Sequence, residues 1–283
     1  MENKNASISI FASSVSDRSF YIRLNDNRLV LMDMGCVNLL TPNIPSKKLF
    51  ENFVKELQTI CGSEIITIAA LFITHPHDDH TNLLEHLEAL GLDKYFVIEK
   101  IIRKFPPKTW EPKNDWENPN YPQKIENILQ SMKCSEIITP VKGDVLDFDG
   151  VKFEILLTAD EAPDDAKDMN YFSMIIRQTV GNKTILWTGD MSDSLGNKAI
   201  SLYGESLKSD ILQIPHHGTP NCGSLDFFQK VDADLHIWNV AKNTFLNPDY
   251  MFAYGKFPIP TAIYDMPVEK VFCGEEKVVE IKI

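Results

Sequence analysis

The chain has 283 residues, of which 43% are hydrophobic and 24% are charged, and its formal net charge is −12. This composition is typical of a soluble globular protein, and the sequence has no run of about 18 apolar residues that could span a bilayer. The excess of acidic residues also argues against a broadly basic surface of the kind that binds nucleic-acid backbones unspecifically, although a local basic groove stays open. An integral membrane protein is therefore excluded.

The N-terminus, "MENKNASISIFASSVS", is polar and lacks the basic start and apolar segment of a secretory signal. The five cysteines are scattered and form no CxxC pair, which is typical of reduced thiols in a cytosolic protein. These features predict a cytoplasmic protein without a membrane partner.

Strands and helices are expected to alternate along the chain, which is typical of an α/β fold. A helix is predicted to begin near Ser46 and to end before Gly62, and a short amphipathic helix is predicted to end at Gly91. Further helices are expected at 123–132 and 225–231. Strands are expected at 6–12, 19–24, 28–35, 65–74, 94–102, 151–159, 172–180, 183–190, 210–218, 234–240, 261–265 and 277–283.

A proline- and tryptophan-rich segment over residues 105–121 has no usable period and is predicted to be a loop. Such a loop either caps a functional site or lies on the surface, and both readings stay open. Because no fixed repeat or low-complexity segment interrupts the chain, residues 1–283 are predicted to form a single domain.

The segment "THPHDDH" places His75, His77, Asp79 and His80 directly after an apolar strand. Imidazole and carboxylate groups are ligands for zinc, iron or manganese, and a turn after a strand allows such side chains to converge. The spacing therefore predicts a metal site at this strand end.

Two later strands end in residues of the same kind. The strand in "ILWTGD" leads to Asp190, and the strand in "ILQIPHHG" leads to His216 and His217. Each pair alone is weak evidence, because Gly-Asp turns and paired histidines are common. Three strands that deliver metal-type ligands at their carboxyl ends together predict one site.

With these motifs in this order, the sequence resembles the metallo-β-lactamase superfamily, and within it the metallo-β-lactamase-type domain of the competence protein ComEC. The segments "SDRSFYIRLNDNRLVLMDMG", "VKGDVLDFDGVKFEILL", "NYFSMII" and "SDILQIPHHGTPNCGS" also contribute to the resemblance. It implies a four-layer αββα sandwich with two divalent metal ions at the sheet edges. By this resemblance the metal ligands would be His75 and His77 for one ion, Asp79, His80 and His216 for the other, and Asp190 as a bridge, with Asp33 orienting the site.

The sequence departs from the family pattern in three places. Asn170 stands where many members have a further metal-binding histidine, so Asn170, Asp160, Asp168 or water is expected to complete the first ion's ligands. Asn247 precedes Pro248 where ComEC usually has His-Pro. No transmembrane channel domain accompanies the motifs, so DNA uptake is not expected of this chain.

The resemblance favours hydrolysis of a phosphodiester, in a nucleic acid or a small nucleotide, by water activated between two metal ions, with zinc expected and manganese as the other candidate. The candidate catalytic residues are Asp79, Asp190 and His217; His217 is expected to contact the substrate or to protonate the leaving group. Two other readings stay open: a hydrolase of lactone, thioester or lactam bonds, and a metal-binding scaffold without turnover.

Overall fold

The computed structural model describes most of the chain, including every segment that carries the predicted metal ligands. The described residues are 9–15, 18–36, 46–87, 89–114, 117–219, 223–242, 263, 265–274 and 278–283. Cys222, Asn247 and Pro248 lie outside them, so the prediction about the Asn-Pro pair concerns residues that are not described.

The first sheet has seven strands in the order β14-β1-β2-β3-β4-β5-β6. The opening strands β1, β2 and β3 pair antiparallel, and β3 to β6 run parallel. The strands are β1 (Ser9–Ala12), β2 (Phe20–Arg23), β3 (Leu29–Met32), β4 (Ile66–Ile73), β5 (Phe96–Arg103), β6 (Cys134–Ile138) and β14 (Val279–Lys282).

The second sheet also has seven strands, in the order β13-β12-β11-β10-β9-β8-β7. Antiparallel hairpins build one half, and β10 to β13 run parallel in the other half. The strands are β7 (Val145–Phe148), β8 (Val151–Leu157), β9 (Ile175–Val180), β10 (Lys183–Trp187), β11 (Ile211–Gln213), β12 (Leu235–Trp238) and β13 (Glu269–Phe272).

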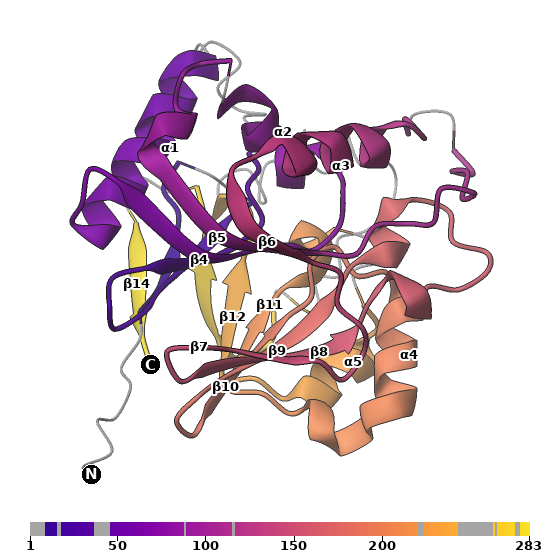
Figure 1. Cartoon of the computed structure of the whole chain (residues 1–283). Helices are drawn as coiled ribbons and strands as arrows, with labels where there is room; N and C mark the ends of the chain where they lie inside the picture. The colour runs from indigo at the N-terminus through magenta and orange to yellow at the C-terminus, as the bar shows by residue number, and fades with distance from the viewer. Residues whose placement is uncertain are drawn as a thin grey trace.

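Helices cover the outer face of each sheet (Figure 1). The first sheet is covered by α1 (Ser46–Cys61), α2 (Asp78–Leu87) and α3 (Tyr121–Ser131), and the second by α4 (Asp193–Tyr203) and α5 (Leu225–Val231). Short 3₁₀ turns occur at η1 (Asp93–Tyr95), η2 (Ala159–Glu161), η3 (Met169–Phe172), η4 (Gly204–Leu207) and η5 (Pro215–Gly218). The predicted four-layer αββα sandwich is therefore confirmed.

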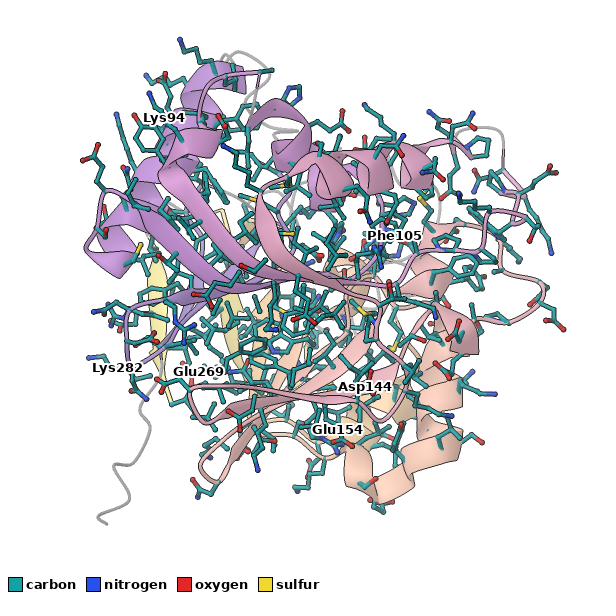
Figure 2. All side chains as sticks on the ribbon, in the orientation of Figure 1. Lys94, Phe105, Asp144, Glu154, Glu269 and Lys282 are labelled. Carbon is teal, nitrogen blue, oxygen red and sulfur yellow. The ribbon has the colours of Figure 1, made fainter. Side chains whose placement is uncertain are left out.

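Three apolar clusters hold the layers together, because each strand turns alternate residues toward the other sheet and toward a helix. In β10, Ile185 and Trp187 face the partner sheet, whereas Leu186 packs in the cluster that α4 and α5 cover. Figure 2 shows side chains filling the space between the sheets, with charged residues such as Lys94, Glu154 and Lys282 at the periphery.

The structure differs from the sequence reading at several elements. The second helix begins at Asp78 rather than Thr81, so Asp79 and His80 lie in its first turn. An aspartate is favourable there because it lies near the positive end of the helix dipole. Helix α4 and strands β6, β7 and β13 were not predicted; α4 contains a glycine, Gly196, and the strands are only four or five residues long.

No helix among the described residues is long and apolar enough to cross a membrane.

His236 provides a test of how burial affects stability. It lies in β12, fully buried beside Phe228 of α5, and neither ring nitrogen has a hydrogen-bond partner. Burial, with a smaller contribution from Lys270, lowers the pKa of His236 from 6.5 to about 4. Because the unfolded chain binds the proton more tightly, this group's contribution is complete above about pH 6.5 and is lost as the pH falls toward about 4.

We therefore expect the unfolding free energy of the parent to fall by about 3 kcal/mol more than that of His236→Leu when the pH is lowered across this window. Urea denaturation of both metal-free proteins, at neutral pH and near pH 4, measures that difference. Burial also lowers the pKa of His216 to about 4, so the comparison between the two proteins is the readout. Equal losses in both would contradict the burial of a neutral imidazole.

Candidate metal centre

The site forms where the carboxyl ends of three strands meet at one edge of the sandwich. β4 ends at Ile73, β10 at Trp187 and β11 at Gln213, and a segment with predicted metal ligands follows each strand. The two sheets come into direct contact here, since Met174 N donates to Thr74 O at 2.9 Å. The side chain of Gln213 accepts from Thr188 N and Gly189 N and fixes the turn that leads to Asp190.

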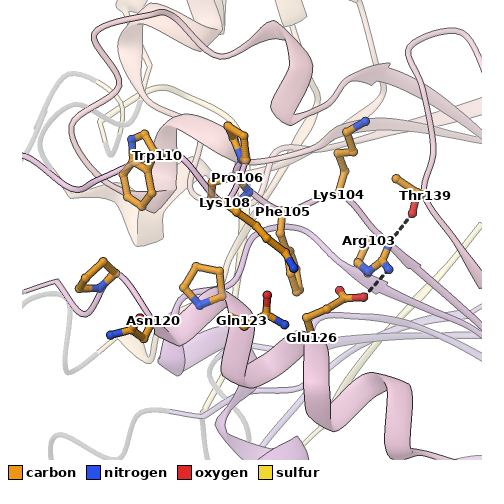
Figure 3. Close-up of a pocket in the computed structure, with 13 residues that line it drawn as sticks. Arg103, Lys104, Phe105, Pro106, Lys108, Trp110, Asn120, Gln123, Glu126 and Thr139 are labelled. Atoms are coloured by element: carbon orange, nitrogen blue, oxygen red, sulfur yellow. Dashed lines mark hydrogen bonds and ion pairs between the residues drawn. The ribbon is translucent and has the colours of Figure 1, made fainter.

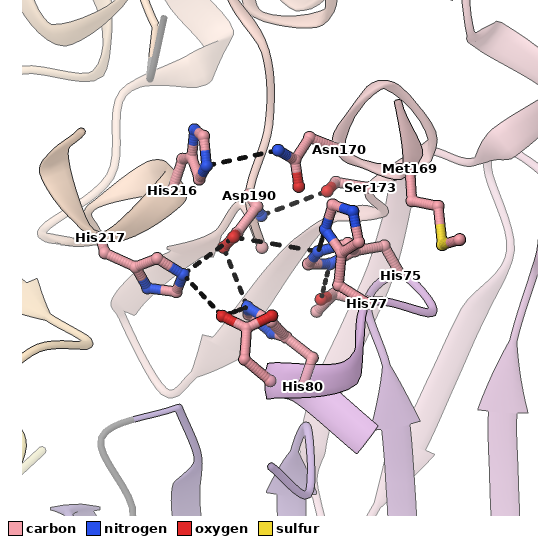
Figure 4. A network of polar contacts seen from close by, with 12 residues as sticks. His75, His77, His80, Met169, Asn170, Ser173, Asp190, His216 and His217 are labelled. Atoms are coloured by element: carbon pink, nitrogen blue, oxygen red, sulfur yellow. Dashed lines mark hydrogen bonds and ion pairs between the residues drawn. The ribbon is translucent and has the colours of Figure 1, made fainter. Parts of the chain in front are cut away.

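Asp79, His80, Asp190 and His217 form one compact group, with one ligand atom from each within 4.8 Å of the others (Figure 4). His217 Nε2 lies 2.9 Å from Asp190 Oδ2 and 3.3 Å from Asp79 Oδ2. His80 Nε2 lies 3.2 Å from Asp190 Oδ1. Two imidazoles and two carboxylates around a shared point are a ligand set suited to a divalent transition metal.

His75 and His77 lie on the other side of Asp190. His75 Nε2 is 3.9 Å from Asp190 Oδ2 and 3.0 Å from His77 Nδ1. The carboxylate of Asp190 therefore faces His75 on one side and His80 and His217 on the other (Figure 4). This arrangement can hold two ions that share one carboxylate.

Asp33 anchors two of the histidines from behind. Its carboxylate accepts from Thr74 N and Thr74 Oγ1, both at 2.7 Å, and from His80 Nδ1 at 2.7 Å. Because Thr74 Oγ1 donates its proton to Asp33, it accepts from His75 Nδ1 at 3.1 Å. Both imidazoles thus donate from Nδ1 and turn Nε2 into the site, as metal-binding histidines do. The sequence reading had given Asp33 this orienting role by resemblance.

A second set of contacts that orient site residues, made by Asn239 and Arg18, was not predicted from the sequence. His217 Nδ1 donates to Asn239 O at 3.2 Å, which leaves Nε2 to face the carboxylates. Arg18, almost fully buried, donates from Nη1 to the same carbonyl at 2.8 Å and from Nε to Asp79 Oδ2 at 3.0 Å. Arg18 thereby holds in place both the Asp79 carboxylate and the Asn239 carbonyl that accepts from His217. The motif "SDRSF" contains this arginine, but its spacing alone gives no sign of the contact.

Glu117 is another site residue that sequence reasoning missed. It lies in the 105–121 loop and is buried, and its Oε1 is 3.0 Å from His77 Nε2. The described part of this loop therefore reaches the predicted metal ligands.

The two adjacent histidines of η5 lie in different places. Both have left-handed backbone conformations, with φ of 46° at His216 and 58° at His217, which non-glycine residues rarely adopt outside functional sites. His217 belongs to the four-residue group. His216 lies outside that group, is partly exposed, and has its Nε2 3.3 Å from Asn170 Nδ2.

The segment 158–172 contains the residues that were expected to complete the first ion's ligands. Asn170 is buried, and its Oδ1 has no hydrogen-bond partner. Asp168 caps η3 by accepting from Asn170 N at 3.0 Å, and the exposed Asp160 pairs with Lys104 at 2.8 Å. At the site, Asn170 thus presents a buried oxygen that has no hydrogen-bond partner in the described part of the chain (Figure 4).

Mutual electrostatics set the charges of these groups. Burial raises the pKa of Asp190, but the adjacent His217 and His80 outweigh burial and hold it well below its ordinary range. Burial lowers the pKa of His80, and Asp190, Asp79 and Asp33 together raise it well above 6.5. Without a metal ion, a protonated His80 therefore neutralises the carboxylates, so an ion that binds here displaces a proton.

The donor set fits a metal ion. Among the described residues, four buried atoms of the site make no hydrogen bond of ordinary geometry: His80 Nε2, His217 Nε2, Asp190 Oδ1 and Asn170 Oδ1. The two imidazole nitrogens form ion pairs with Asp190 at 3.2 and 2.9 Å. Such atoms are costly unless another group satisfies them, and all four belong to the site. A cation bound between them would remove that cost.

No family model matches the chain. ComE operon protein 3 from Bacillus subtilis (strain 168) is 28% identical over 178 residues, which are 62% of this chain and 20% of that protein. The uncharacterized protein YcaI from Escherichia coli (strain K12) is 26% identical over 172 residues, which are 61% of this chain and 18% of YcaI. The chain spans about a fifth of the length of these curated relatives.

Two solved structures share the fold. The metallo-β-lactamase fold protein YhfI from Bacillus subtilis superposes with a TM-score of 0.53 and 14% identity, over 98% of this chain and 100% of YhfI. CmlA, a diiron β-hydroxylase from Streptomyces venezuelae, superposes with a TM-score of 0.52 and 12% identity, over 100% of this chain and 55% of CmlA.

The chain therefore has the metallo-β-lactamase fold, with a His/Asp cluster that supports binding of a divalent metal. The match to ComE operon protein 3 supports the more specific, ComEC-like relation that the motifs had indicated.

Proposed function

We propose that the protein is a metallohydrolase with two divalent metal ions that cleaves phosphodiester bonds. One observation carries the proposal: a protein oxygen atom holds one ring nitrogen of each of four histidines. His75, His80 and His217 turn Nε2 toward the carboxylate of Asp190, and His77 turns Nδ1 toward His75 Nε2. Such rear contacts hold metal-binding imidazoles in the correct tautomer before an ion arrives.

In this proposal the second ion is held by Asp79, His80, Asp190 and His217. The first ion is held by His75, His77 and Asp190, with Asn170 Oδ1 as the added oxygen donor. The proposal exchanges the sequence-based roles of the two adjacent histidines, because His217 is in the four-residue group and His216 is not. Its partial exposure makes His216 the better candidate for contact with substrate.

A pair of divalent ions, when bound, supplies an activated water and stabilises negative charge that develops on the substrate. The chain's own residues position that chemistry. Asp190 holds both ion sites at one separation, and Arg18 keeps Asp79 directed into the site. His216 accepts a hydrogen bond from Asn170 through Nε2, and Gly218, two residues further on, has a φ of 77°, which glycine adopts readily.

The choice of an anionic substrate rests on the resemblance of the motifs to the ComEC-type domain, and ComE operon protein 3 is among the proteins that the chain matches. A cavity of about 520 Å³ also lies beside the 105–121 loop, and three cations, Arg103, Lys104 and Lys108, line it together with one carboxylate, Glu126 (Figure 3). Arg103 pairs with Glu126 and Lys104 pairs with Asp160, so the charge of this cavity is largely balanced and the choice of a phosphodiester rests on the resemblance of the motifs.

The test combines metal analysis with a substrate panel. We expect the protein, reconstituted with zinc or manganese, to bind two ions per chain and to hydrolyse bis(p-nitrophenyl) phosphate. p-Nitrophenyl acetate, an acyl-homoserine lactone and a chromogenic β-lactam serve as the comparison substrates. The same preparation treated with a chelator is the control for metal dependence.

Each other outcome contradicts a definite part of the proposal. Turnover confined to esters, lactones or lactams would overturn the phosphodiester specificity and keep the metal pair. Two bound ions without turnover of any substrate would favour the scaffold reading. Binding of one ion or none after reconstitution would overturn the shared-carboxylate site.

A further inference from the structure

Glu117 is the residue through which the 105–121 loop reaches the metal centre. Its side chain is 2% exposed, and Oε1 lies 3.0 Å from His77 Nε2. The same oxygen accepts from Met169 N at 2.8 Å, and Oε2 accepts from Asn114 Nδ2 at 3.3 Å. Asn114 Oδ1 in turn accepts from Glu117 N at 3.1 Å. The carboxylate is therefore fixed on three sides and is directed at one imidazole.

These contacts determine which nitrogen of His77 carries the proton. A carboxylate accepts and does not donate, so the nitrogen that faces Glu117 is the protonated one, Nε2. In the neutral ring, Nδ1 is then the accepting nitrogen. It faces His75 Nε2 at 3.0 Å, and His75 also presents an accepting nitrogen there because its Nδ1 donates to Thr74. Either a shared proton or a metal cation between the two nitrogens satisfies this pair, so the pair is also suited to bind a metal ion.

We infer that Glu117 is a positioning residue for the first metal ion: it holds His77 in the Nε2–H tautomer, so that Nδ1 and His75 Nε2 bind the ion together. This inference rests on the metal pair of the proposed function. In this inference the 105–121 loop does not bind the metal ion itself. Its Glu117 orients His77, which binds the ion.

The surroundings of Glu117 explain why this support is rigid. Trp110 Nε1 donates to Ala166 O at 3.3 Å, and the indole packs edge-on against Phe172. Lys113 N donates to Lys167 O at 2.9 Å. The loop is thus docked on the segment that contains Asn170, and Glu117 links His77 to the backbone of that segment at Met169. The carboxylate of Glu117 therefore contacts both His77 and the segment that contains Asn170.

The experiment uses the full-length protein, in metal-free form and during titration with zinc. Long-range ¹H–¹⁵N spectra of the histidine rings report each tautomer and show which rings respond to added zinc. Competition with a chromophoric chelator gives the affinities. The variants are Glu117→Ala and Glu117→Gln, and the control is Glu111→Ala, which removes an exposed carboxylate from the same loop.

We expect Glu117→Ala to weaken zinc binding at His75 and His77 by about 10- to 100-fold, as loss of an orienting carboxylate does elsewhere. The His77 signals of the metal-free variant should no longer show a fixed Nε2–H tautomer. Binding at His80 and His217 should stay unchanged, and Glu111→Ala should match the parent in every measurement. Glu117→Gln should weaken binding of the first ion less than Glu117→Ala does, because the amide oxygen still accepts from His77.

The inference is overturned if a folded Glu117→Ala protein keeps both the His77 tautomer and the parent affinity. If Glu117→Ala does not fold, parent-like affinity and tautomer in both Glu117→Gln and Glu117→Leu overturn it equally. A failure of the proposed function has a different signature. In that case the parent itself binds no zinc at His75 and His77, while its metal-free spectrum still reports whether Glu117 fixes the tautomer.

Discussion

Asp190→Ala is expected to abolish metal-dependent hydrolysis, with a loss of at least about 1,000-fold, equivalent to about 4 kcal/mol of transition-state stabilisation. The reason is geometric. The carboxylate lies 2.9 Å from His217 Nε2, 3.2 Å from His80 Nε2 and 3.9 Å from His75 Nε2, so it is the group within reach of both proposed ions. Steady-state kinetics and metal content of the purified variant, measured together, test the expectation.

The matched control is Asp234→Ala. Asp234 is an exposed aspartate that precedes β12, at the opposite end of the same parallel strands, so its loss should change neither activity nor metal content. Asp190→Ala should still unfold cooperatively, because β10 and the apolar clusters are unchanged. Parent-like turnover in a folded Asp190→Ala protein would remove this residue from the mechanism.

Gly35→Ala is expected to destabilise the protein by about 4 kcal/mol or more and to reduce metal binding at Asp79 and His80. A Cβ atom at Gly35 would lie 1.8 Å from Asp79 O, 2.4 Å from Asp79 C and 2.5 Å from His80 C. These are backbone atoms of the first turn of α2, so no side-chain rotation relieves the clash. The turn that carries two proposed ligands must move.

Gly196→Ala is the control for this prediction. In α4 the added methyl group would meet the flexible end of Met191 at 3.1 Å, and alanine is a better helix former than glycine by about 1 kcal/mol. Its unfolding free energy should therefore stay close to that of the parent. Urea denaturation and zinc stoichiometry of the two variants separate the effects. A Gly35→Ala protein with the parent's stability would show that segment 33–36 does not pack against α2 as described.

The apolar patterns of the sequence predicted most of the strands and helices, because burial leaves a local period in each of them. Thus β4 and α5 lie close to their predicted ranges. The four layers were expected from the resemblance to the metallo-β-lactamase superfamily. Short elements are harder to predict, since four residues contain too little of a period. The strand expected at 261–265 lies largely outside the described residues, and β13 forms instead at Glu269–Phe272.

The sequence alone located the segments with the predicted metal ligands, because each motif follows directly on its own apolar strand, and its resemblance to the metallo-β-lactamase superfamily indicated the four-layer fold. Only the tertiary structure decided which atoms meet. Arg18 and Asn239 are 221 residues apart in the chain, and Glu117 is 40 residues from His77, so no local pattern reports their contacts. The choice between His216 and His217 depends on two consecutive left-handed backbone conformations, and residue identity at those positions does not specify them. Side-chain type is a local property, whereas the direction in which a side chain points depends on the path of the whole chain.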